Sequence, residues 1–109
     1  MADISPVRSP EVLDALFENS HSAPVVLFKH SSSCGISAHL LEEMSAVAGE
    51  VNVIVVQDNR DLSNAVEART GFRHQSPQAF VLKNGKAVYH ASHYGIDPAA
   101  INAHLEAGE

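Results

Sequence analysis

Continuous apolar runs alternate along the chain with segments whose apolar residues recur at helical spacing. The runs at 25–28 and 51–56 are each bounded by turn residues, which predicts two strands covered on both faces. Helical spacing, with Ser9-Pro10 and Asp97-Pro98 as start signals, predicts the helices. They cover about residues 10–19, from 34 to near 49, 62–71, and from 98 onward.

Shorter apolar segments complete the predicted sheet. Residues 3–8 predict an edge strand, and residues 79–82 and 87–91 flank Asn84-Gly85, the dipeptide most typical of a hairpin turn. Strands that alternate with helices predict a parallel sheet, to which the hairpin adds an antiparallel margin. The sequence therefore predicts an α/β fold with a central mixed sheet of four to five strands flanked by about four helices.

Composition narrows the class of protein. A chain of 109 residues with 45% hydrophobic and 18% charged residues fits a single folded domain, 1–109. A net charge of -6 with only 7 Lys plus Arg argues against a nucleic-acid partner. The sequence has no signal-peptide pattern at its start and no apolar stretch long enough to span a membrane, so we expect no membrane partner and a cytoplasmic location.

Cys34 is the one cysteine and stands at the start of the predicted helix that follows strand 25–28. The unpaired N–H groups and positive dipole end of a helix N-terminus stabilise thiolate, which is the nucleophilic form. A lone cysteine can equally be a buried, inert apolar residue. A single cysteine cannot form an internal disulfide. If Cys34 is reactive, its redox turnover therefore needs an external thiol.

The order of elements, with Cys34 opening the second helix and Ser76-Pro77 preceding the fourth strand, resembles the thioredoxin fold. The resemblance implies a cis peptide bond before Pro77 and places that loop beside the cysteine. The backbone of Ser76 would then pair with a bound thiol peptide. In the motif Cys34-Gly35-Ile36-Ser37, Ser37 stands where thioredoxin has its second, resolving cysteine, which is the pattern of monothiol members.

Three blocks resemble the YtxJ-type thioredoxin-like proteins, also called monothiol bacilliredoxins, of bacteria that use bacillithiol. These blocks are residues 28–37, 69–79 and 89–96. Gly35 differs from the proline of many relatives, and Cys-Gly-x-Ser is also similar to monothiol glutaredoxins.

The resemblance implies a thiol–disulfide oxidoreductase that acts on mixed disulfides between cytosolic proteins and a low-molecular-weight thiol, with bacillithiol favoured. The Cys34 thiolate would attack the small-thiol sulfur, release the protein thiol and remain S-thiolated until a second small thiol resolves it. The small thiol is then a co-substrate, S-thiolated cytosolic proteins are the partners, and no resident cofactor is required.

Other residues are assigned supporting roles. The Ser37 hydroxyl would either donate a hydrogen bond to the thiolate or cap the helix. Lys29 and His30 end the strand before Cys34, where they would add positive potential or bind a carboxylate of the small thiol, although an exposed lysine is usually a solvated surface charge. Gly35, together with Ser76 and Pro77, would complete the substrate site.

Two further interpretations stay open. Seven histidines and one cysteine show no clustered spacing of the kind zinc requires, so we expect no resident metal. Two chains and two external thiols could instead bridge an iron–sulfur cluster, as the glutaredoxin likeness suggests. The remaining alternative is a non-catalytic thioredoxin-like adaptor with an inert Cys34.

Overall fold

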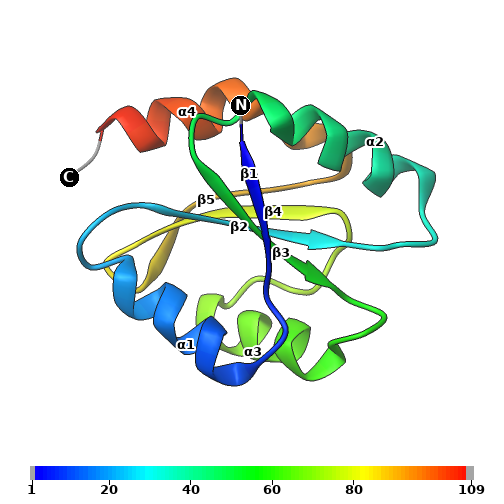
Figure 1. Cartoon of the computed structure of the whole chain (residues 1–109), viewed down its shortest axis with the longest axis horizontal. Coiled ribbons are helices and arrows are strands. Elements are labelled where there is room, and N and C mark those ends of the chain that lie inside the picture. Colours follow the sequence, from blue (N-terminus) through cyan, green and yellow to red (C-terminus); the bar gives the residue numbers. More distant parts are fainter. Residues whose placement is uncertain (1, 108–109) are drawn as a thin grey trace.

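The computed structural model describes residues 2–107 and places a mixed five-stranded sheet between two layers of helices (Figure 1). The strands are β1 (Asp3–Pro6), β2 (Val25–His30), β3 (Glu50–Val55), β4 (Gln78–Lys83) and β5 (Lys86–Ser92). The helices are α1 (Pro10–Asn19), α2 (Gly35–Glu43), α3 (Arg60–Thr70) and α4 (Pro98–Ala107), with 3₁₀ turns η1 (Met44–Ala46) and η2 (His93–Gly95). The predicted α/β class and mixed sheet are confirmed.

Sheet topology brings two loops together. The strand order is β1-β3-β2-β4-β5, in which β1 and β2 run parallel to β3, and β4 runs antiparallel to β2 and β5. Lys29 near the end of β2 pairs with Gln78 at the start of β4. The segment after β2, which holds Cys34, and the segment before β4, which holds Pro77, therefore leave the sheet at the same edge.

Each face of the sheet has its own apolar core. Successive residues of β2 point to opposite faces, so Phe28 packs with α2 and α4 whereas Leu27 packs with α1 and α3. Figure 1 shows these two helix pairs on opposite sides of the sheet. The buried central strands explain why their sequences are nearly continuous apolar runs.

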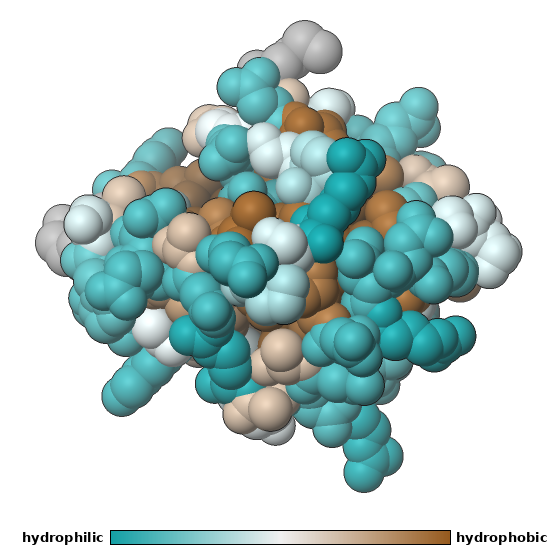
Figure 2. All heavy atoms as spheres, turned by 60° about the horizontal axis from the view of Figure 1, so that its bottom comes forward, coloured by the Kyte–Doolittle hydropathy of each residue, from teal (hydrophilic) through white to brown (hydrophobic). Residues whose placement is uncertain are grey.

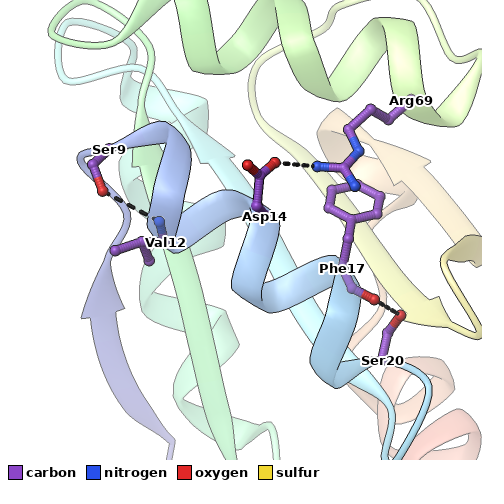
Figure 3. Close-up of polar contacts among 6 residues, drawn as sticks. All are labelled: Ser9, Val12, Asp14, Phe17, Ser20 and Arg69. Atoms are coloured by element: carbon purple, nitrogen blue, oxygen red, sulfur yellow. Dashed lines mark hydrogen bonds and ion pairs between the residues drawn. The ribbon is translucent and has the colours of Figure 1, made fainter.

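Polar contacts join α1 to the rest of its layer (Figure 3). Ser9 caps the helix by accepting a hydrogen bond from the Val12 N–H at 3.2 Å. From the end of α3, Arg69 reaches Asp14 at 2.7 Å and stacks its guanidinium 4.0 Å from the centre of the Phe17 ring. Because the ion pair is exposed, it contributes at most about 1 kcal/mol to stability.

The surface over α1 and α3 is mostly hydrophilic, with apolar atoms visible between the polar side chains (Figure 2). Across residues 2–107, every helix is too short or too polar to cross a bilayer.

Two elements differ from the sequence prediction. The helix expected to reach residue 49 ends at Glu43, and η1 continues the turn before Val47 returns to extended backbone. The turn η2 was not predicted. It forms where His93 adopts a positive φ of 52°, a conformation that apolar periodicity does not signal.

Candidate functional site

Cys34 occupies the N-cap position of α2. Its backbone is extended (φ −115°, ψ 121°), the residue is partly exposed, and its side chain makes no capping hydrogen bond to the first turn. No acidic residue lies in that turn. The helix N-terminus therefore presents backbone N–H groups and a positive dipole end, without a competing carboxylate, at the position of the thiol. The neighbouring Gly35 is exposed and borders open space.

One side chain from another loop holds the three serines that precede Cys34. Gln57, just after β3, accepts a hydrogen bond from the Ser32 N–H at 3.1 Å. Its Nε2 donates to Ser31 Oγ at 2.8 Å and to Ser33 Oγ at 3.1 Å. Sequence reasoning missed Gln57, because a polar residue in a predicted loop carries no sign of a partner 24 to 26 residues away.

Ser37 has neither of the two roles predicted for it. Its buried Oγ accepts a hydrogen bond from the Ser31 N–H at 2.9 Å and lies 2.8 Å from Nδ1 of His30. Burial lowers the pKa of His30, which favours a neutral ring whose Nδ1 accepts the single hydroxyl hydrogen of Ser37. Both Cys34 and Ser37 are within the described chain, and no hydrogen bond joins them. Ser37 thus ties the end of β2 to the first turn of α2.

Lys29 corrects the expectation of a surface lysine near the thiol. Its side chain is 0% exposed, and its Nζ donates to the Ser63 carbonyl at 3.0 Å and to Nδ1 of His74 at 3.3 Å. Burial lowers the pKa of Lys29 to about 8, against the opposing effect of the Glu67 carboxylate. In this conformation the Lys29 amine lies on the face covered by α1 and α3, where it cannot contact a small thiol from solvent.

The Ser76–Pro77 peptide bond is cis, as the resemblance implied. The Pro77 carbonyl accepts a hydrogen bond from the His93 N–H at 3.0 Å, which anchors η2 against this loop. The turn η2 also packs next to α2. The chain thus connects the cis-proline loop to the helix that begins at Cys34.

A buried carboxamide organises the loop from inside. Gln78 donates from Nε2 to the Arg73 carbonyl at 3.0 Å and accepts at Oε1 from the Gln75 N–H at 3.2 Å. The same Nε2 lies 2.8 Å from Nε2 of His90, whose ring stacks on Phe72 with centroids 4.0 Å apart. Burial, and secondarily the Lys29 charge, lowers the pKa of His90. These residues were absent from the predicted site, because no motif marks Gln78 as a partner of His90, 12 residues away.

The structure therefore divides the predicted residues into two groups. His30 at the end of β2 and Cys34, Gly35 and Ser37 at the start of α2 lie on either side of one connection. Ser76-Pro77 lies on the adjoining loop, whereas Lys29 points into the opposite layer. In residues 2–107, no group of three or more His, Cys, Asp or Glu side chains is arranged to hold a metal ion. A hollow of about 350 Å³ lies at the far edge of the sheet, beside Val25 and Gly49.

Comparison with solved structures supports the fold. A structure described as a candidate oxidoreductase with a thioredoxin fold superposes with a TM-score of 0.83 and 28% identity, over 94% of this chain and 93% of that one. Thioredoxin from Trypanosoma brucei brucei superposes with a TM-score of 0.73 and 16% identity, over 96% of this chain and 89% of that one. Thioredoxin from Fasciola hepatica superposes with a TM-score of 0.71 and 15% identity, over 96% of this chain and 99% of that one.

A family model is more specific than these folds. The model described as monothiol bacilliredoxin BrxC matches residues 5–101, which include Cys34, Ser37 and Pro77. With a thioredoxin fold and a partly exposed cysteine at a helix N-terminus, this match over most of the sequence assigns the chain to the monothiol bacilliredoxin BrxC family.

Proposed function

We propose that the chain is a monothiol thiol–disulfide oxidoreductase that removes bacillithiol from S-thiolated cytosolic proteins. The observation that carries this proposal is the position of Cys34, partly exposed at the N-cap of α2 with no acidic residue in the first turn. Thiol exchange requires an accessible thiolate, and reactive cysteines are commonly found partly exposed at helix N-termini. Family membership supports the reaction class, and the choice of bacillithiol rests on that family.

The reaction takes place in two exchanges. The Cys34 thiolate attacks the bacillithiol sulfur of the mixed disulfide, the protein–sulfur bond breaks, and the client leaves as its thiolate. The thiolate of a second bacillithiol molecule then attacks the adduct on Cys34, which restores the Cys34 thiolate and yields bacillithiol disulfide. The second bacillithiol is the reductant, so the electrons balance without a resident cofactor.

We assign the supporting roles from their places around Cys34. Gly35 gives a client open access beside the sulfur, and the backbone of Ser76 next to Pro77 offers an edge for main-chain hydrogen bonds. Ser37 and His30 hold the shape of the segment that presents the thiol. Under this proposal Ser37 is a positioning residue, because its hydroxyl is engaged by Ser31 and His30.

The direct test uses a bacillithiolated protein substrate with the wild type and Cys34→Ser, which keeps the side-chain shape but removes the thiol. We expect release of the small thiol only with the wild type. Equal release by both proteins would refute the proposal and leave the iron–sulfur carrier and the adaptor interpretations.

Intact-mass measurement identifies the small thiol. After separate treatment with oxidised bacillithiol and oxidised glutathione, we expect an adduct on wild-type Cys34 that forms faster with bacillithiol. Faster formation with glutathione would contradict the assignment of bacillithiol while keeping the nucleophile. An unmodified Cys34 in both treatments would contradict both assignments.

A further inference from the structure

A small cavity of about 110 Å³ opens at the start of α3. It lies between the end of β3, the first turns of α3 and the loop that leads to Pro77. Its lining residues are Val56, Arg60, Ser63, Asn64 and His74. Apart from the valine, every lining side chain is polar, and the cavity is large enough for a small ionised group and too small for a whole peptide or cofactor.

Buried Lys29 determines which hydrogen bonds His74 can make. A charged lysine amine is only a donor, so Nδ1 of His74, at 3.3 Å, must be an acceptor. The Ser63 hydroxyl, 3.0 Å from the same nitrogen, is the second group directed at it. A neutral His74 therefore carries its hydrogen on Nε2, the ring nitrogen on the side away from Lys29.

The cavity consequently offers donors of hydrogen bonds together with positive charge. Arg60 and Asn64, which also line the cavity, carry guanidinium and amide N–H groups. Burial has the largest effect on the pKa of His74 and lowers it; the charges of Lys29 and Arg60 lower it further, whereas the Glu67 carboxylate acts in the opposite direction. Glu67, the nearby carboxylate, already accepts the His74 backbone N–H at 3.1 Å.

The Glu67 carboxylate acts on Lys29 from beyond ion-pair distance. Among the residues that the structure describes, the one ion pair is Arg69–Asp14, so Lys29 has hydrogen-bond acceptors without a direct carboxylate partner. A buried ammonium is stabilised by a nearby anion. Arg60 also lines a neighbouring hollow, together with Asp58 and Asp61.

The cavity lies at the same edge of the sheet as the thiol. The Val56 N–H donates to the His30 carbonyl at 2.9 Å, which joins the cavity wall to the strand that leads to Cys34. His74 stands three residues before Pro77 on the predicted substrate loop. Figure 1 shows the loops after β2 and β3 and the loop before β4 at this edge.

We propose that the cavity formed by Arg60, Asn64 and His74 binds a carboxylate of the small thiol that is exchanged at Cys34. This inference rests on the proposed function, which it deepens by naming a specificity site. Arg60 supplies the charge-assisted hydrogen bond, and His74, held in one tautomer by Lys29, supplies a fixed neutral donor. The small thiol is therefore recognised by its carboxylate as well as by its sulfur.

The kinetic test compares two mixed disulfides of one protein, made with bacillithiol and with bacillithiol whose malyl carboxylates are esterified. We expect the wild type to act about tenfold faster on the acid than on the ester, and Arg60→Gln to lose that preference. Arg73→Gln removes the same charge from an exposed residue outside the cavity lining, and this variant should keep the preference for the acid. An unchanged preference in Arg60→Gln would overturn the site.

A binding measurement separates failure of the site from failure of the reaction. We would titrate the wild type, Arg60→Gln and Arg73→Gln with malate and follow the His74 ring and Asn64 amide signals by NMR. Saturable shifts in the wild type and Arg73→Gln, with an affinity for malate about tenfold lower in Arg60→Gln, would support the site even if turnover were absent. If malate left these signals unmoved in the wild type, the carboxylate site would be refuted, whatever the turnover.

Discussion

Replacing Lys29 by methionine should remove a pH-dependent cost to stability. Methionine keeps the length and apolar stem of lysine but cannot be charged. In the folded protein, burial lowers the pKa of Lys29 from 10.5 to about 8, so the unfolded chain binds this proton more tightly. At 1.36 kcal/mol for each pH unit of that difference, the charged amine costs the fold roughly 3 kcal/mol at pH 7.

The sign of the effect follows from proton binding. Below a pH of about 8, Lys29 is protonated in both states and the full cost applies. As pH rises from about 8 towards 10.5, the folded protein loses the proton first, and wild-type stability rises relative to Lys29→Met. The two acceptors of Lys29 tolerate its loss, because the Ser63 carbonyl lies within α3 and His74 Nδ1 keeps the Ser63 hydroxyl.

Urea unfolding of both proteins between about pH 7 and pH 11 measures the effect, since other titrating groups cancel in the difference. We expect wild type minus Lys29→Met to increase by roughly 3 kcal/mol across this range. Lys86→Met, at an exposed position in β5, is the matched control and should show no such trend. A difference that stays constant with pH would refute the reasoning that the buried amine carries the cost.

Three further predictions concern the site. Ser37→Ala leaves the Ser31 N–H and His30 Nδ1 without their partner and should lower the free energy of unfolding by about 1–3 kcal/mol in urea titrations. Ser45→Ala, at an exposed position, should change it little, and equal effects of the two substitutions would contradict the assigned contacts. Burial lowers the pKa of His30, so the unfolded chain takes up this proton first as the pH falls below about 6.5, and the free energy of unfolding should fall on acidification. His30→Gln should reduce the dependence of the free energy of unfolding on pH, and His39→Gln, at an exposed position, should not. Gly35→Pro should raise the free energy of unfolding by roughly 0.4–1 kcal/mol, because residue 35 is the first helical position and Cys34 already has extended backbone. The thermal midpoint should rise accordingly, and a lower midpoint would count against this account.

Local patterns were sufficient to predict most of the fold. The runs at 25–28 and 51–56 identify central strands because both their faces are buried, and Asn84-Gly85 identifies the hairpin because both residues need positive φ. Helix ends were less predictable. The break after Glu43 depends on how Met44 and Val47 reach the core, which is a tertiary effect.

The site was predicted where it follows the chain and missed where it depends on distant partners. Cys34 and the cis bond before Pro77 came from motif and element order. Lys29 was misjudged because lysine is usually exposed, although strand alternation puts it on the same face as buried Leu27. Its acceptors, Ser63 and His74, are 34 and 45 residues away, and no local pattern connects them.

The hydroxyl of Ser37, engaged by Ser31 and His30, has a kinetic consequence for the proposed reaction. A second cysteine in the place of Ser37 would resolve the adduct on Cys34 in a first-order step, whose rate does not depend on the concentration of free small thiol. With a serine locked in that place, resolution is second order, and its rate rises in proportion to the concentration of free small thiol. Under the proposed reaction, the concentration of free small thiol sets the lifetime of the adduct, and the S-thiolated fraction of the protein rises when that concentration falls.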